Sequence, residues 1–555
     1  MRREILKKIL YGILVILVLG VAIFFGIRVF DLKRSSDLKD IDFLNSHIDI
    51  IDSEIASSVK EVKKDNDMDI YDMNYQNVIS RKINDLLLDD YTADKPLIIY
   101  NPYGTNNNSV NIYFKTEKPS SVSYTVKVDG FNDFTRTLKN NGDDNYTTNH
   151  SYQLIGFILG YTNKLELKVT DEDGSSKTYN FEFDMRNLEN HAKSKLDSEN
   201  ETDSELTDGL YTVLGNDSES DDFVFLYDND GVIRGEIPII GYRAHRILFD
   251  GDMMYFSVGE STMAAVNSLG KITNLYNLGR YHLHHDYVFD GDGNIIILAS
   301  DTEADTCEDM IIRLNLESGD VDGVLDMADL FDDMREKAVL PDGENSSDDG
   351  DGLDWIHLNT IQYLGNDEVV VSSRELSTII KIDDIFDSPK IDYLIGSEEV
   401  WKGTDEEDYL LTKDGDFKIQ GGQHSVTYEK IDDDSYYLYL FDNNMGVSTT
   451  RKDIEWKEAG LENSKGRKGD TSHYYKYLVN EKDRTFELVS EFDVPYSGYV
   501  SSVQEIGKTI VVDSGMACTF GEYTGDGELI KSFNMDCEKF IYRVYKYDFP
   551  NLFVD

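Results

Sequence analysis

With 555 residues, 40% of them apolar and 12% aromatic, the chain can form two or three domains with apolar cores, which excludes disorder throughout. Its 106 acidic and 54 basic residues give a net charge of −52, which repels nucleic acid and anionic lipid headgroups and argues against both as partners. Three cysteines exclude a disulfide framework and a four-cysteine zinc site. One Cys518–Cys537 bridge and free buried thiols both remain open.

The first 35 residues contain a long apolar run between basic flanks. Ile9 to Ile27 carry no charge, and nineteen such residues are enough for a helix to cross a bilayer of about 30 Å. A cleavable signal is the alternative, but no small-x-small cleavage site follows the run. Residues 1–35 are therefore predicted to be an uncleaved membrane anchor. The basic flanks, four residues against three, do not determine its orientation.

Residues 36–92 are predicted to be a helical stalk. Apolar residues recur at steps of three and four in two stretches, which predicts an amphipathic helix over 38–64 and a second, short helix. The stripes are Ile48, Ile51, Ile55, Val59 and Val62, and then Val78, Ile79, Ile83, Leu86 and Leu87. Such a pair either lifts the rest of the chain off the membrane or dimerises.

From residue 93 the apolar period changes to two. Short alternating stretches such as Val122 to Val128, separated by Gly and Asn clusters, predict a small β-sandwich over 93–190. Residues 191–208 are rich in Ser, Glu and Asp, which indicates an acidic linker without an element of its own.

The remainder, 209–555, consists of short strands with turn signals and no helical period. Six similar units open near residues 209, 243, 284, 356, 423 and 499. Four strands in each unit predict a six-bladed β-propeller, with seven blades as the main alternative. Polar insertions at 335–353, 402–418 and 450–470 are predicted to be loops on one face.

Three of these units begin with a histidine. His285, His357 and His424 each stand eight positions before a turn residue. Because the first strands of propeller blades meet at a common axis, three imidazoles that are distant in sequence are expected to become neighbours. Asn359 shares the strand face of His357, and Arg374 ends the next strand.

A metal site is the natural alternative, because His282, His284 and His285 crowd one strand. Alternation along that strand, however, lets at most two of them face the same way. Imidazoles, an amide and a guanidinium suit a tetrahedral oxyanion better than a divalent metal, with no carboxylate needed. No metal or cofactor is therefore predicted.

Four motifs in order resemble the bacterial arylsulfate sulfotransferase family: the His284-His285-Asp286 run, residues Asp354 to Thr360, Ser372-Ser373-Arg374 with Ile379 to Asp383, and Gly422 to Ser425. The resemblance spans about 94–549. It implies a small β-sandwich and a six-bladed propeller that moves a sulfuryl group from a phenolic sulfate ester to an acceptor phenol. No activated nucleotide donor takes part.

The resemblance also implies roles for the residues. His424 is the expected nucleophile, which becomes a sulfohistidine between two half-reactions. His357 is the expected general acid and base, while His285, Arg374 and Asn359 hold the sulfuryl oxygens, with His284 as the alternative to His285. Dimerisation is known in the family, so a homodimer is an expected option. No cysteine is close in sequence to His424, unlike in several members that have a disulfide near the nucleophile.

Together these inferences predict an enzyme at the cell membrane with its catalytic domain on the extracytoplasmic side. Two other functions stay open at this point. One is a non-catalytic propeller that binds partners at a surface, in which Arg374 has no task. The other is a metal-dependent hydrolase or lyase on the same fold.

Overall fold

The computed structural model describes residues 40–65, 68–139, 145–188, 193–215, 223–241, 243–340, 352–446, 448–461 and 470–549. The predicted anchor, residues 1–35, lies outside the described residues. Among the helices of the described ranges, none has both the length and the apolar character needed to span a bilayer.

The segment 36–92 is part of the N-terminal domain, and its predicted long helix is wrong. After a short helix over 40–47, the chain forms β1 (Asp49–Asp52) and β2 (Val59–Lys63), an antiparallel pair whose second strand pairs in parallel with β3 (Leu97–Tyr100). Ile48, Ile55 and Val59 are buried, but Ile51 is exposed. The apolar residues that suggested a helix therefore lie in two strands and the turn between them. The pairing of β2 with the distant β3 outweighs the local preference for a helix.

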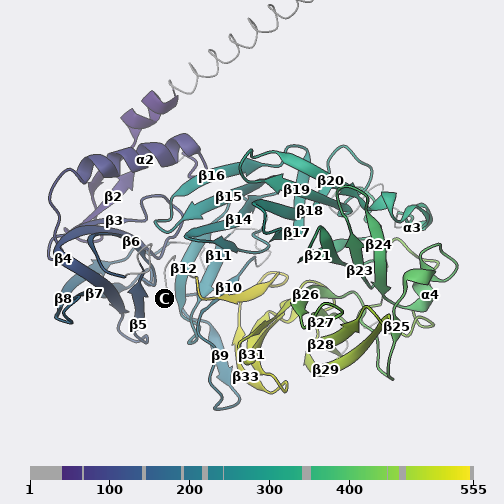
Figure 1. Ribbon diagram of the computed structural model, residues 1–555. Coiled ribbons are helices and arrows are strands. Elements are labelled where there is room, and N and C mark those ends of the chain that lie inside the picture. Colours follow the sequence, from purple (N-terminus) through teal and green to yellow (C-terminus); the bar gives the residue numbers. More distant parts are fainter. Residues whose placement is uncertain are drawn as a thin grey trace, which may run out of the picture.

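The second predicted helix is present as α2 (Met73–Leu86). Its first turn is capped by Asp72, whose carboxylate accepts hydrogen bonds from the backbone N–H groups of Asn74 and Tyr75. Val78, Ile79 and Ile83 are buried in one apolar cluster with residues of β3 and of β4 (Val110–Lys127). The helix thus lies on the β domain (Figure 1) instead of standing apart as a stalk.

The N-terminal β domain is organised around one long strand, β4 (Val110–Lys127). Its first half pairs with β3 and β6 (Thr147–Leu154), and its second half pairs with β5 (Phe134–Leu138) and β7 (Thr162–Asp171). The edge strand β8 (Ser176–Asp184) follows β7. Strands β3 to β8 all lie within 93–190, the range for which the sequence predicted a small β-sandwich, and they belong to one hydrogen-bonded sheet.

Six further sheets form the blades of the propeller (Figure 1). From inner to outer strand, blade 1 has β34 (Val544–Tyr547), β10 (Leu210–Val213), β11 (Phe223–Tyr227) and β12 (Ile233–Pro238). Blade 2 has β13 (Leu248–Asp250), β14 (Met253–Gly259), β15 (Thr262–Asn267) and β16 (Ile272–Asn277). Blade 3 has β17 (Tyr281–Phe289), β18 (Asn294–Asp301), β19 (Met310–Asn315) and β20 (Val321–Asp326).

Blade 4 has β21 (Leu358–Gly365), β22 (Glu368–Ser373), β23 (Thr378–Asp383) and β24 (Lys390–Ile395). Blade 5 has β26 (His424–Lys430), β27 (Ser435–Asp442), β28 (Thr471–Asn480), β29 (Thr485–Pro495) and β25 (Thr412–Lys413). Blade 6 has β30 (Ser502–Ile506), β31 (Thr509–Ser514), β32 (Thr519–Thr524), β33 (Leu529–Asn534) and β9 (Asp197–Asn200). Short helices lie between strands: η1 (Met327–Asp329), α3 (Asp332–Lys337), α4 (Glu398–Trp401), η2 (Glu407–Tyr409) and η3 (Gly515–Ala517).

The ring of blades is closed at two places. The C-terminal strand β34 is the innermost strand of blade 1, and β9 is the outermost strand of blade 6. The predicted linker 191–208 therefore does contain an element. The side chains of Asp197–Asn200 are exposed, so β9 is held by its backbone pairing with β33, which leaves no signal in the hydropathy of the segment.

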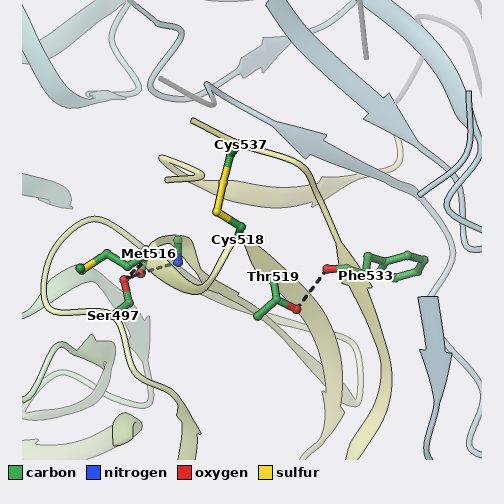
Figure 2. Close-up of a disulfide and its surroundings, with 8 residues drawn as sticks. Ser497, Met516, Cys518, Thr519, Phe533 and Cys537 are labelled. Carbon is green, nitrogen blue, oxygen red and sulfur yellow. Dashed lines mark hydrogen bonds between the residues drawn. A yellow bond between two sulfur atoms is a disulfide. The ribbon is translucent and has the colours of Figure 1, made fainter. Parts of the chain in front are cut away.

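A disulfide joins Cys518 to Cys537 in blade 6 (Figure 2), while Cys307 is buried and takes no part in a disulfide. The two cysteines are 19 residues apart in sequence, and their bridge connects the end of η3 to the segment that follows β33. Of the two possibilities that the sequence left open for Cys518 and Cys537, a bridge or two thiols, the structure contains the bridge.

We expect the Cys518→Ser, Cys537→Ser double variant to lose about 3 kcal/mol of the free energy of unfolding, because the bridge restricts the unfolded chain over this loop length. Urea unfolding measures the loss. Cys307→Ser is the matched control for removal of a thiol, and a double variant as stable as the wild type would contradict the prediction.

Candidate active site

The three predicted histidines lie at irregular places along the innermost strands of blades 3, 4 and 5: His285 in β17, His357 directly before β21, and His424 at the start of β26. His285 and His357 have φ of +50°, and Ser425, next to His424, has φ of +57°. The pairing register shifts at each place, in β17, β21 and β26. A bulge with a left-handed residue re-aims the neighbouring side chain and is costly for a residue with a Cβ. Because such a bulge recurs next to each of the three histidines, we infer that the bulges position these side chains.

The bulges bring the histidines together. The ring centroids of His285 and His357 are 4.8 Å apart, and His285, His357 and Arg374 are all close enough to His424 to lower its pKa when they carry a charge. All three imidazoles are buried. Three blades thus contribute one cluster, as the repeat predicted.

The imidazole of His424 is held in one tautomer. Its Nδ1 lies 2.8 Å from Asn443 Oδ1 and 3.0 Å from the Gly422 carbonyl oxygen. Asn443 donates through Nδ2 to the carbonyls of Ser497 and Val500, so its Oδ1 faces the ring as an acceptor. Because both partners of Nδ1 accept, Nδ1 carries the proton and Nε2 carries the lone pair. Burial and the nearby cationic groups hold the pKa of His424 well below its ordinary value, so the ring stays neutral.

His357 has the opposite electrostatic environment. Its Nδ1 lies 2.6 Å from Asp354 Oδ2 and 2.5 Å from Glu308 Oε2. Burial and Arg374 lower the pKa of His357, but the two carboxylates outweigh them and raise it to about 9. The ring is therefore protonated at neutral pH. Its Nε2 is buried and has no hydrogen-bond partner among the described residues.

His285 is fixed on both sides. Its Nδ1 lies 2.9 Å from the Tyr542 hydroxyl and its Nε2 3.1 Å from Glu308 Oε2. Burial lowers its pKa to about 3, so the ring is neutral. His284 also approaches Glu308, at 3.5 Å, and His282 is half-exposed. Two of the three histidines thus face one carboxylate, within the predicted limit of two, but they are consecutive residues because the bulge interrupts the alternation of the strand.

Arg374 and Asn359 lie beside the histidines. Arg374 Nη2 donates to Asp354 at 3.2 Å and to Glu375 at 2.9 Å. Asn359 Nδ2 donates to the carbonyl oxygen of Gln423 at 2.8 Å. Asn359 therefore contacts the residue that precedes His424.

Comparison with known proteins identifies the family of the chain. Residues 195–543 match the arylsulfotransferase (ASST) family, which is more than half of the chain, and residues 97–186 match the arylsulfotransferase Ig-like domain. The chain belongs to the arylsulfotransferase family. Family membership makes it an aryl sulfotransferase that does not depend on the activated nucleotide donor PAPS and that transfers a sulfuryl group between phenolic substrates. It also favours an enzyme over a non-catalytic binding propeller.

Similar solved structures are remote from this arylsulfotransferase. A putative 6-phosphogluconolactonase from Bacteroides uniformis is 12% identical, with a TM-score of 0.31 and coverage of 78% of this chain and 98% of the other. A second, from Bacteroides fragilis, is 10% identical, with a TM-score of 0.32 and coverage of 77% and 98%. A functionally unknown protein from Desulfotomaculum acetoxidans is 8% identical, with a TM-score of 0.33 and coverage of 63% and 100%. No curated protein matches the arylsulfotransferase chain.

The arylsulfotransferase site contains carboxylates that the sequence interpretation did not expect. Glu308 contacts both His285 and His357, and Asp354 contacts His357. Burial raises the pKa of Glu308, but His357 and His285 lower it well below its ordinary value. Asp354 was visible as part of the motif that contains His357. Glu308 lies in the β18–β19 loop, and only the fold places it at the cluster.

The C-terminal residues Tyr542 and Arg543 were also missed. Arg543 Nη1 donates to the carbonyl oxygens of His245 and His285, and Asp286 Oδ1 lies 3.2 Å away. These residues precede β34, so the closure of the ring brings them into contact with blades 2 and 3. Their role is to hold the strand that carries His285.

His285, Glu308 and His357 are a candidate metal set, with ligand atoms within 4.8 Å of one another. The donor set fits a metal poorly. His357 Nδ1 holds its proton between two carboxylates, so only Nε2 could bind an ion, and the raised pKa of about 9 means that the ion must compete with a proton for this atom at neutral pH. The arrangement is better suited to hold a proton.

Proposed function

We propose that this aryl sulfotransferase works by a ping-pong reaction in which His424 becomes a sulfohistidine. The observation that carries the proposal is the tautomer of His424: its Nδ1 proton is held by Asn443 and Gly422, and its Nε2 lone pair is available. A neutral imidazole is a competent nucleophile, and two displacements replace one harder step.

In the first half-reaction, the His424 Nε2 lone pair attacks the sulfur of the aryl sulfate. The N–S bond forms while the S–O bond to the phenolic oxygen breaks, and the electron pair leaves with that oxygen. His357, protonated at neutral pH, donates its Nε2 proton to the departing oxygen. The products are a phenol and the sulfohistidine.

The second half-reaction reverses these steps with the acceptor. The now neutral His357 takes the proton of the acceptor phenol, whose oxygen attacks the sulfur. The N–S bond breaks, and its electron pair returns to His424 Nε2. Asp354 and Glu308 act as positioning residues, because they hold His357 Nδ1 and set the pKa on which both proton transfers depend.

Arg374, Asn359 and His285 are proposed to bind the nonbridging sulfuryl oxygens. Each preorganised donor of this kind lowers the barrier by about 3 kcal/mol. Arg374 supplies a permanent positive charge in a chain of net charge −52, and the carboxylates of Asp354 and Glu375 hold its guanidinium in place. In the structure Asn359 and His285 make hydrogen bonds within the protein, so both would exchange or share them when substrate binds.

Mass spectrometry tests the intermediate. After incubation with para-nitrophenyl sulfate and no acceptor, a digest protected from acid should carry a sulfuryl adduct on the peptide with His424, and addition of phenol should remove it. Turnover without any adduct on that peptide would contradict the ping-pong route. Metal analysis of the active protein tests the remaining alternative, because a metal-dependent hydrolase would retain a stoichiometric ion.

We also propose that the catalytic domain is extracytoplasmic and tethered by residues 1–35. The Cys518–Cys537 disulfide supports an oxidising compartment. Fractionation of cells and protease treatment of intact cells test this, since a catalytic domain in the cytoplasm would be protected. The homodimer stays a prediction, which sedimentation of the purified protein tests.

A further inference from the structure

An aromatic face borders the active site on the side of blades 6 and 1. We define it by Tyr499, Met516 and Phe540. Tyr499 lies between β29 and β30, Met516 lies in η3 between β31 and β32, and Phe540 lies between β33 and β34. Connections between blades and connections between the second and third strands of a blade emerge at the same end of a propeller, because successive strands are antiparallel. The Arg374, Glu308 and Asn443 loops are of the same kinds, so this face and the catalytic residues share one end.

Hydrogen bonds connect the segments of the aromatic face to two of the catalytic histidines. The Ser497 and Val500 carbonyls, on either side of Tyr499, accept the two hydrogen bonds of Asn443, which holds His424. Two residues after Phe540, the Tyr542 hydroxyl contacts His285 Nδ1 at 2.9 Å.

All three side chains are held in place; Tyr499 and Met516 are open to solvent, whereas Phe540 is buried. Tyr499 is 37% exposed and Met516 is 38% exposed, and the ring of Phe540 stands edge-on to Tyr499 with centroids 5.5 Å apart. The Met516 backbone N–H donates to Ser497 Oγ (Figure 2). The Met516 sulfur lies 3.1 Å from the Gly498 nitrogen. The Cys518–Cys537 bridge joins the segments that carry Met516 and Phe540. Exposed apolar side chains that are fixed in this way are typical of a binding surface.

We propose that Tyr499 and Met516 bind the aryl ring of both the donor and the acceptor, with the buried ring of Phe540 packed edge-on against Tyr499 to hold it in place. This rests on the proposed reaction at His424. Aromatic rings pack against one another edge-on or offset, and a thioether packs well against a ring edge. One surface serves both half-reactions, because each phenolic oxygen must approach the same sulfur on the same histidine. The aromatic face thus selects phenolic over aliphatic substrates.

The test compares Tyr499→Ala and the Tyr499→Ala, Met516→Ala double variant with wild type in para-nitrophenyl sulfate and phenol assays. Loss of ring packing should raise KM for both substrates about tenfold in the double variant, while kcat at saturation changes by less than about twofold. Tyr499→Phe should restore the wild-type KM, because the ring and not the hydroxyl makes the contact. Tyr409, on η2 and 39% exposed, provides the matched control as Tyr409→Ala.

If the double variant kept the KM values of the wild type while the wild type turned over normally, the aryl-binding assignment would be overturned. The proposed reaction at His424 would not be affected by that result. Failure of the proposed reaction has a different signature, since the wild type itself would then form no adduct. Both substituted side chains are more than a third exposed, so the variants are expected to fold. Circular dichroism and the unfolding midpoint verify this.

Discussion

His424→Ala is expected to lower sulfuryl transfer by about 10⁴-fold or more and to leave no sulfuryl adduct on the enzyme, because the nucleophile is the one group without a substitute in a covalent route. The effect is expected for every aryl sulfate, including those with good leaving groups. Release of para-nitrophenolate and mass spectrometry of the donor-treated protein measure the two parts of the prediction.

The matched control is His473→Ala, in β28 of the same blade. His473 bonds Asp442 through Nδ1 at 2.7 Å and has no place in the proposed reaction, so its loss should leave transfer nearly intact. Asn443→Ala should show a smaller loss than His424→Ala, because Nε2 remains but the Nδ1 proton keeps only the Gly422 carbonyl as its partner. Transfer by His424→Ala at a rate close to wild type would place the covalent step elsewhere.

His357→Ala should slow transfer by about 10²–10⁴-fold with donors that release a basic phenolate, because the leaving oxygen then departs without a proton. With para-nitrophenyl sulfate the loss should be much smaller, since that phenolate is stable without protonation. A plot of the logarithm of kcat/KM against the leaving-group pKa should therefore be steeper for the variant than for the wild type. Parallel plots would contradict a role in proton donation.

The pH dependence checks the same assignment independently. The pKa of His357 is raised to about 9, so the acid form is present below that pH and is lost as pH rises through it. Donor kcat/KM of the wild type should fall above about pH 9. Because the pKa of His424 is lowered well below its ordinary value, its nucleophilic form persists on the acidic side of neutrality.

Glu308→Gln tests which group causes the alkaline fall. It removes one of the two carboxylates that raise the pKa of His357, so the fall should move to lower pH. His357→Ala should lose the fall altogether. A fall that stays in place in Glu308→Gln would assign it to another group.

Much of this architecture could be predicted from the repeated pattern of the sequence. Alternating apolar residues and regular turn signals predicted the β domain and six blades, since both depend on local periodicity. Two predictions were wrong, the helix over 38–64 and the linker without an element, because the structure of these segments depends on distant parts of the chain. Strands β2 and β9 exist because distant strands offer them backbone partners, and neither hydropathy nor spacing records such a partner.

The sequence by itself determined which residue types are available for the chemistry: histidines at the head of three units, with Asn359 and Arg374 at fixed offsets. Only the tertiary structure decided their protonation and surroundings. His424 is neutral and His357 is cationic, although both are buried imidazoles, because Asn443 meets one while Glu308 and Asp354 meet the other. A pKa depends on charges a few ångströms away, and in a propeller those charges come from loops that are far apart in the chain.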